Sequence, residues 1–195
     1  NDLVIGTHGR GVIIVDDISP MRGLTANILD KEVHLFSNKP VPLSSGKFGD
    51  GGFPPTGGWT AGNPASLPAV QYYLKERVMT GDVKLDIYDA AGKLVQTVPG
   101  SKRKGINKVY WNMRMTPIKP AAGGAKMDYG AFVAPMVMPG EYTLKLKVGE
   151  KEYTDKMVVV HDEGNKNFSK EDLEARHSAA MDLYNMQADI NALIT

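Results

Sequence analysis

The sequence predicts a mainly β protein: an antiparallel β-sandwich with a β-hairpin before it and a helix after it. Between residues 69 and 162, short runs alternate apolar and polar side chains, as strands with one buried face do. Turn signals such as Pro139-Gly140 separate these runs. After residue 168 the apolar residues recur at helical spacing instead.

Residues 1–22 are predicted to form the hairpin. Two apolar runs, at 3–5 and 12–15, flank a Gly-rich turn, His8-Gly9-Arg10-Gly11. The second run is apolar at every position, which is typical of strands in a sheet covered on both faces. Pro20 then ends the extended segment because it cannot donate to a ladder. The hairpin therefore has the composition of a sheet interior, and we expect it to be a piece of a larger sheet in a longer chain.

Residues 23–68 are predicted to be a Gly/Pro-rich connector that holds a short helical turn and a strand at 32–36. Within it, "SSGKFGDGGFPPTGGWTAGNPASLP" shows no apolar periodicity. Such a stretch is either a mobile linker or a long loop ordered by its neighbours, and the pattern leaves both alternatives open.

Residues 69–162 are predicted to form the sandwich, with about seven strands. In "VKLDIYD" the apolar residues occupy every second position, and "NKVYWNMR" and "EYTLKLKV" repeat this spacing. Trp111 and Tyr142 fall on the inward set and are predicted to lie in the core. The other inward positions in these three runs are Val83, Leu85, Ile87, Val109, Met113, Leu144, Leu146 and Val148.

Residues 163–195 are predicted to contain a C-terminal helix. Ser169 is the expected N-cap, Asp172 takes the place of the capping-box acid, and Phe168 with Leu173 fits a hydrophobic staple. No Gly or Pro stop precedes Thr195, so we expect further sequence after the helix in the parent protein. One stripe of the helix is expected to dock on the sandwich or on another helix: Leu173, Ala180, Leu183, Gln187, Ile190 and Ile194.

Composition excludes several classes of function. The net charge of +1 gives no electrostatic basis for binding nucleic acid or an anionic membrane. No apolar run approaches the roughly 20 residues that a membrane-spanning helix needs. The chain has no cysteine, so disulfides, thiolate metal sites and thiol nucleophiles are excluded.

The turn Thr7-His8-Gly9-Arg10 invites a catalytic interpretation, because His serves as a general base and Arg binds anions. A tight turn is the favoured interpretation, since spacing places no nucleophile or partner carboxylate beside it. A glycosidase would need two carboxylates that flank the scissile bond. The acidic candidates are expected at strand ends or on solvent faces, where solubility and turn formation explain them: Asp16, Asp17, Asp86 and Asp89.

Metal binding is not predicted. The four histidines, His8, His34, His161 and His177, are too scattered for a zinc motif. Asp50 and the pair Asp162-Glu163 could contact calcium, but they lack the spacing of an EF-hand loop, so solvated loops are favoured.

An aromatic platform for sugars is the remaining candidate site. Trp59, in the connector, is the best candidate for glycan contact, although packing of its loop on the sandwich is favoured. The other aromatic residues considered are Phe53, Tyr72, Tyr73, Tyr110 and Tyr129.

The order of these segments resembles a known family. "DLVIGTHGRGVIIVDDISPMR" is similar to the last blade of the bacterial sortilin-like or xyloglucanase-like β-propellers, many of which are labelled glycosyl hydrolases. "YYLKE", "LDIYDAAGKLV", "INKVYWNMR" and the Pro-Gly-Glu-Tyr strand resemble the Ig-like domain of flagellar hook-capping proteins and C-terminal secretion modules. The resemblance implies an Ig-like or fibronectin type III-like sandwich, with the hairpin as a propeller remnant and His8 and Arg10 as turn residues of its last blade.

The resemblance also implies a function. The catalytic acids of such propellers lie in earlier blades, so no catalytic, cofactor-binding or metal-binding residue is expected here. We expect a non-catalytic accessory module of an exported protein, extracellular or periplasmic, that packs on the upstream propeller and contacts protein or glycan. The alternatives are a rim-forming part of a propeller glycoside hydrolase and a carbohydrate-binding module that uses Trp59. Pairing of copies through the N-terminal strands is a further expectation, because an unpaired edge accepts strands.

Overall fold

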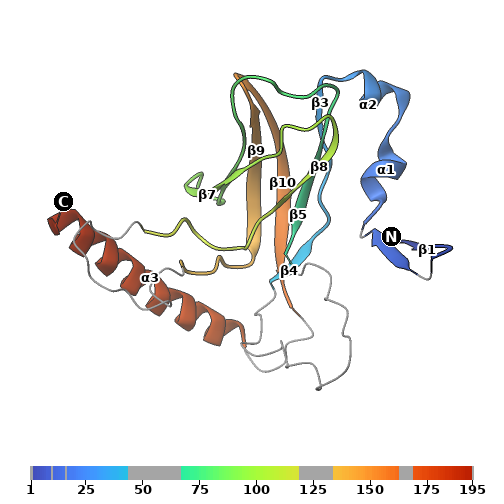
Figure 1. Cartoon of the computed structure of the whole chain (residues 1–195). Coiled ribbons are helices and arrows are strands. Elements are labelled where there is room, and N and C mark those ends of the chain that lie inside the picture. Colours follow the sequence, from blue (N-terminus) through green and yellow to red (C-terminus); the bar gives the residue numbers. More distant parts are fainter. Residues whose placement is uncertain are drawn as a thin grey trace.

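The protein is mainly β, with a long C-terminal helix and strands arranged in several sheets (Figure 1). A computed structural model describes residues 2–9, 11–15, 17–43, 67–118, 134–162 and 169–194. The strands of these ranges form one sheet of five strands, one of three and one of two.

The five-stranded sheet has the order β4-β10-β9-β6-β7. Its neighbours pair antiparallel, except that β4 runs parallel to β10. The β9–β10 turn includes Gly149, whose φ of +59° is a left-handed conformation that favours glycine. The strands are β4 (Val41–Leu43), β6 (Val83–Tyr88), β7 (Leu94–Pro99), β9 (Gly140–Val148) and β10 (Lys151–His161).

The three-stranded sheet is antiparallel, with β5 (Ala69–Leu74) between β3 (Val33–Leu35) and β8 (Gly105–Tyr110). The structure therefore differs from the expected layout, in which the sheets begin at residue 69. β3 confirms the strand predicted at 32–36, but it and β4, both from the segment predicted as a connector, each add an edge strand to one of the two larger sheets.

The two larger sheets share one hydrophobic core, and the predicted alternation is confirmed there. Val83, Leu85 and Ile87 of β6 are buried together, as are three of the inward residues of β9, and the fourth, Val148, is half-buried against them. Trp111 and Tyr142 both lie in this core, with their rings in edge contact at 5.2 Å between centroids. The Tyr142 hydroxyl donates a 2.6 Å hydrogen bond to the Met138 carbonyl, and burial raises the pKa of Tyr142 to about 12.

The helix α3 (Lys170–Ile194) begins with the predicted cap. The Ser169 N–H donates to Asp172 Oδ2 at 2.9 Å, and the Asp172 N–H donates to Ser169 Oγ at 3.1 Å. This reciprocal pair is a capping box with Asp in place of Glu.

The predicted docking stripe of α3 packs on the larger sheets only in part, and docking of the remainder on another helix stays a prediction. Leu173 is buried as expected, but Leu183 and Ile190 are 68% and 56% exposed. The half-buried face includes His177, which hydrogen-bonds the Met136 carbonyl, and Tyr184, which donates to the Thr116 carbonyl at 2.8 Å. The helix therefore docks through Leu173 and through two polar side chains that bond to backbone carbonyls, and part of its apolar stripe faces solvent.

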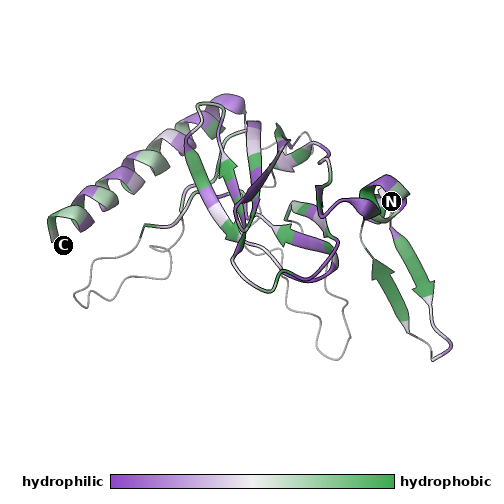
Figure 2. Ribbon diagram, turned by 90° about the horizontal axis from the view of Figure 1, so that it is seen from above, coloured by the Kyte–Doolittle hydropathy of each residue, from purple (hydrophilic) through white to green (hydrophobic). Residues whose placement is uncertain are grey.

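The hairpin β1 (Leu3–Gly6) and β2 (Val12–Val15) forms the two-stranded sheet by itself. Two short helices, α1 (Ser19–Gly23) and α2 (Ala26–Asp30), connect it to β3. Figures 1 and 2 show the hairpin and α3 on opposite sides of the larger sheets.

Candidate functional site: the exposed hairpin and the groove beside α3

The hairpin exposes apolar side chains on both of its faces. Its register pairs Val4 with Ile14 and Ile5 with Ile13. Side chains alternate between faces along a strand, so Ile5 and Ile13 share one face and Val4 and Ile14 share the other. Val4 is 62% exposed and Ile14 60%, and the opposite face is also open to solvent. Figure 2 shows this as two largely hydrophobic strands that project from the rest of the molecule.

The two outer edges of the hairpin carry backbone groups that face away from the partner strand. At the turn, the Thr7 N–H donates to the Gly11 carbonyl at 2.8 Å. Bonded and non-bonded pairs alternate along an antiparallel ladder, so the pairs 4–14 and 6–12 are the ones whose N–H and C=O groups point outward. Apolar faces and open edges together are what an added strand or a covering sheet requires.

Asp17 joins the hairpin to the larger sheets. Its N–H donates to Asp2 Oδ1 at 3.0 Å, and its carboxylate accepts hydrogen bonds from the Ser19 N–H and from Gln71 Nε2 of β5. Hydrogen bonding from Ser19 is the main reason why the pKa of Asp17 is lowered, and Lys39 contributes to the same effect. The φ of Asp17 is +49°, so the chain turns sharply here. This carboxylate tethers the hairpin.

His8, one of the predicted turn residues, lies at the tip of the hairpin. It is exposed, and Thr7 Oγ1 closes the turn by accepting from the Gly11 N–H at 2.9 Å. Arg10 lies outside the described residues. In the part of the chain that the structure describes, no hydrogen bond or ion pair links His8 to a carboxylate.

The acidic candidates in the larger sheets have structural partners, and the expectation that Asp86 lies on a solvent face is wrong, because it is buried. Asp86 accepts from Thr97 Oγ1 at 2.6 Å and from Lys147 Nζ at 2.7 Å. Burial opposes ionisation of Asp86, but the hydrogen bonds from Lys147 and Thr97 outweigh it, and its pKa is lowered. Asp89 accepts two backbone N–H groups of the β6–β7 turn, both at 2.9 Å.

Several predicted candidates fall outside the described residues. Trp59 is one of them, so its role as a glycan contact stays a prediction. Asp16, Asp50, Phe53, Tyr129 and Glu163 also lie there. Of the described aromatic candidates, Tyr72 and Tyr73 are buried and Tyr110 is 46% exposed. Over the same described ranges, no three His, Asp or Glu side chains gather in a metal-binding cluster.

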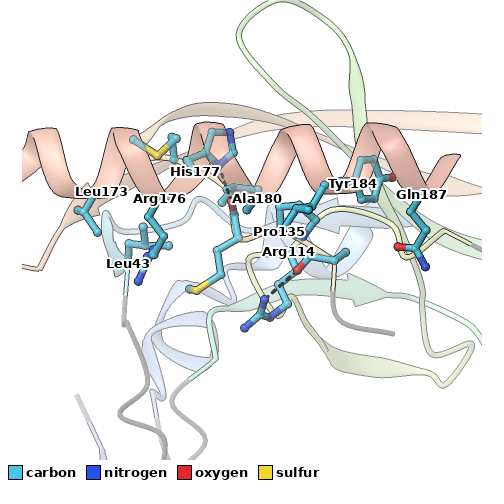
Figure 3. Close-up of a pocket in the computed structure, with 14 residues that line it drawn as sticks. Leu43, Arg114, Pro135, Leu173, Arg176, His177, Ala180, Tyr184 and Gln187 are labelled. Carbon is cyan, nitrogen blue, oxygen red and sulfur yellow. Dashed lines mark hydrogen bonds between the residues drawn. The ribbon is translucent and has the colours of Figure 1, made fainter. Parts of the chain in front are cut away.

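A groove that the sequence analysis missed lies between α3 and the segment 134–138. It encloses about 450 Å³ and is lined by residues of β4, of the segment after β8, of 134–138 and of α3 (Figure 3). The 134–138 segment is held in place because Arg114 bridges Met136 in an isolated β-pair and donates from Nη1 to the Ala134 carbonyl at 2.8 Å. No sequence motif marks this groove, because its residues come from four segments far apart in the chain.

Comparison with known proteins finds no match for this chain among family models, curated proteins or solved structures. The likeness to the propeller family therefore stays a prediction from the sequence. No helix among the described residues is both long and apolar enough to cross a membrane.

Proposed function

We propose that this chain is a non-catalytic accessory module of a larger exported protein, and that it docks through its hairpin on a β-propeller of that protein. The observation that carries this proposal is the hairpin itself. Its side chains are apolar on both faces and exposed, while the two larger sheets have a closed core of their own.

The energetics favour a covered hairpin. An isolated two-stranded ribbon is marginally stable in water at best. Burying the remaining exposed part of one apolar side chain contributes on the order of 1 kcal/mol, and six apolar residues of this hairpin are open to solvent. They are Leu3, Val4, Ile5, Val12, Ile13 and Ile14. A partner that adds strands to both edges and covers both faces would recover this free energy.

We further propose that the larger sheets form an Ig-like sandwich. The order β3-β5-β8 corresponds to strands A, B and E of that fold, and β4-β10-β9-β6-β7 corresponds to A′, G, F, C and C′. Tyr142 supports this assignment, because it lies near the start of β9, the strand equivalent to F, and bonds backwards to a backbone carbonyl. The tyrosine corner of Ig-like domains has this arrangement.

Hydrogen exchange tests the docking proposal. We expect the amides of Val4, Val12 and Ile14 to exchange rapidly in the isolated chain, because their N–H groups point outward. In the protein expressed from the full-length gene, the same amides should be protected. Equal exchange in both proteins would contradict the proposal. Protection that increases with the concentration of the isolated chain would indicate pairing between two copies instead.

Activity measurements separate the accessory role from the enzymatic alternatives. We expect the isolated chain to leave oligosaccharides intact, and turnover by this chain alone would contradict the proposal. If the chain retains polysaccharides, comparison with Trp59→Ala decides whether it is a carbohydrate-binding module that uses this residue. Turnover by the full-length protein would support the role of a rim-forming part only if removal of this chain reduces it.

A further inference from the structure

We propose that the groove between α3 and the segment 134–138 binds a small organic acid with an apolar chain. The carboxylate would meet the guanidinium groups of Arg114 and Arg176, and the apolar part would lie against Leu43 and Leu173. This site is independent of the hairpin and goes beyond the accessory role proposed above.

Charge is the first argument. Both Arg114 and Arg176 line the groove, and the described residues that line it include no carboxylate. Asp172 lies one turn before Arg176, but its carboxylate accepts the Ser169 N–H in the helix cap. Glu174 pairs with Lys170. Within the described ranges, neither guanidinium has an acidic partner, so each is available for a charge-assisted hydrogen bond to a carboxylate.

The two arginines also act on one another. Burial is the main cause that lowers the pKa of Arg114, and the positive charge of Arg176 adds to it. Arg176 is itself exposed, so solvent screens most of this repulsion, and a bound anion would favour the charged form of both groups. Figure 3 shows both side chains extending to the same side of α3. The groove therefore presents an uncompensated positive charge.

The walls of the groove are fixed before any ligand arrives. A carbonyl oxygen can only accept, so His177 Nδ1 carries the proton that is shared with the Met136 carbonyl at 2.9 Å. Tyr184 ties the same face of α3 to the Thr116 carbonyl. The Arg114 guanidinium is oriented by its bond to the Ala134 carbonyl, and it keeps further N–H donors for a ligand. Such preorganisation lowers the entropic cost of binding.

Apart from His177, Tyr184 and Gln187, the rest of the lining is apolar, which favours an acid with a hydrocarbon part. Leu43 and Leu173 are buried against the groove, and Val137 and Ala180 also line it. Its volume of about 450 Å³ is within the usual range for small-molecule sites, roughly 300–1,000 Å³. A compact inorganic anion would leave this apolar wall uncovered.

Calorimetric titration with octanoate tests the proposal, with octanamide and acetate as matched probes. Octanamide keeps the chain without the charge, and acetate keeps the charge without the chain. We expect octanoate to bind the full chain at least tenfold more tightly than either. Because one charge-assisted hydrogen bond is lost, Arg176→Gln should weaken octanoate binding roughly tenfold. Arg77→Gln, which removes a guanidinium that does not line the groove, should leave binding unchanged.

Two further measurements complete the test. Amide chemical shifts should move at residues 134–138 and along α3, and not at residues 3–15, which excludes adsorption to the exposed hairpin. N-acetyl-Leu-Leu with a free or an amidated C-terminus distinguishes a peptide carboxylate from a fatty acid as the source of the ligand. Arg176 is exposed, so its substitution should leave the thermal unfolding midpoint unchanged. Equal binding of octanoate and octanamide, undiminished binding by Arg176→Gln, or no binding by either carboxylate would overturn the proposal.

Discussion

Gly100 follows β7 at a point where the backbone passes close to the core. A Cβ atom at this position would lie 2.7 Å from Val83 Cγ1 and 2.9 Å from the Tyr72 hydroxyl oxygen. Both neighbours are buried, and Tyr72 donates a 2.6 Å hydrogen bond to the Ser101 carbonyl. The Gly100 N–H also donates to the Val83 carbonyl at 2.8 Å, which holds the two segments together. Gly100→Ala therefore cannot be accommodated without moving one of these groups.

The expected loss of stability follows from these contacts. Overpacking a core position costs about 1–3 kcal/mol. Displacing the Tyr72 hydroxyl from Ser101 adds about 1 kcal/mol. Alanine lowers the conformational entropy of the unfolded chain, which stabilises the folded state by about 0.4–1 kcal/mol. The net destabilisation is about 2 kcal/mol, which in a chain of this length lowers the melting temperature by about 4–8 °C.

Chemical denaturation of Gly100→Ala measures this free energy directly. Gly140→Ala is the matched control, because a Cβ at Gly140 meets nothing within 4 Å and its φ is not positive. The control should change the free energy of unfolding by less than about 0.5 kcal/mol. The close approach of Gly100 to the core is refuted if Gly100→Ala has the same free energy of unfolding as the unmodified chain. It is also refuted if Gly140→Ala lowers that free energy as much as Gly100→Ala does.

Three further predictions concern single polar groups. Tyr142→Phe removes the hydrogen bond to the Met138 carbonyl and should lower the free energy of unfolding by about 1 kcal/mol. An unchanged midpoint of urea unfolding would contradict a stabilising role for this bond. Ser169→Ala removes the cap of α3, worth about 1 kcal/mol, and should speed amide exchange in the first turn of α3 but not in β6 or β9. The lowered pKa of Asp86 stabilises the fold above its ordinary pKa of about 3.9, and this contribution is lost as the pH falls through the folded-state value. Asp86→Asn should therefore flatten the acid side of the curve of unfolding free energy against pH, and an unaltered curve would count against the Lys147 and Thr97 contacts.

The sequence by itself determined the features that depend on local periodicity. Alternation placed the inward residues of β6 and β9, together with Trp111, in the core, because a strand turns every second side chain to the same face. The cap of α3 could also be predicted from the sequence, because Ser169 and Asp172 are only three residues apart. The apolar hairpin could also be recognised, because strand, turn and strand are contiguous.

Only the tertiary structure decided which segments meet. β4 has only three residues, which show no alternation of apolar and polar side chains. Its position is set by pairing with β10, in which Val41 lies opposite Val159, more than 100 residues later in the chain. The face of α3 that docks is set by backbone acceptors at Met136 and Thr116, so Leu183 is exposed despite its apolar spacing. Arg114 and Arg176 line one groove because the docking of α3 brings two segments together that are far apart in the chain. Periodicity shows which side chains of a segment lie on its apolar face and which on its polar face. Contacts between distant segments depend on how the sheets pack around the core.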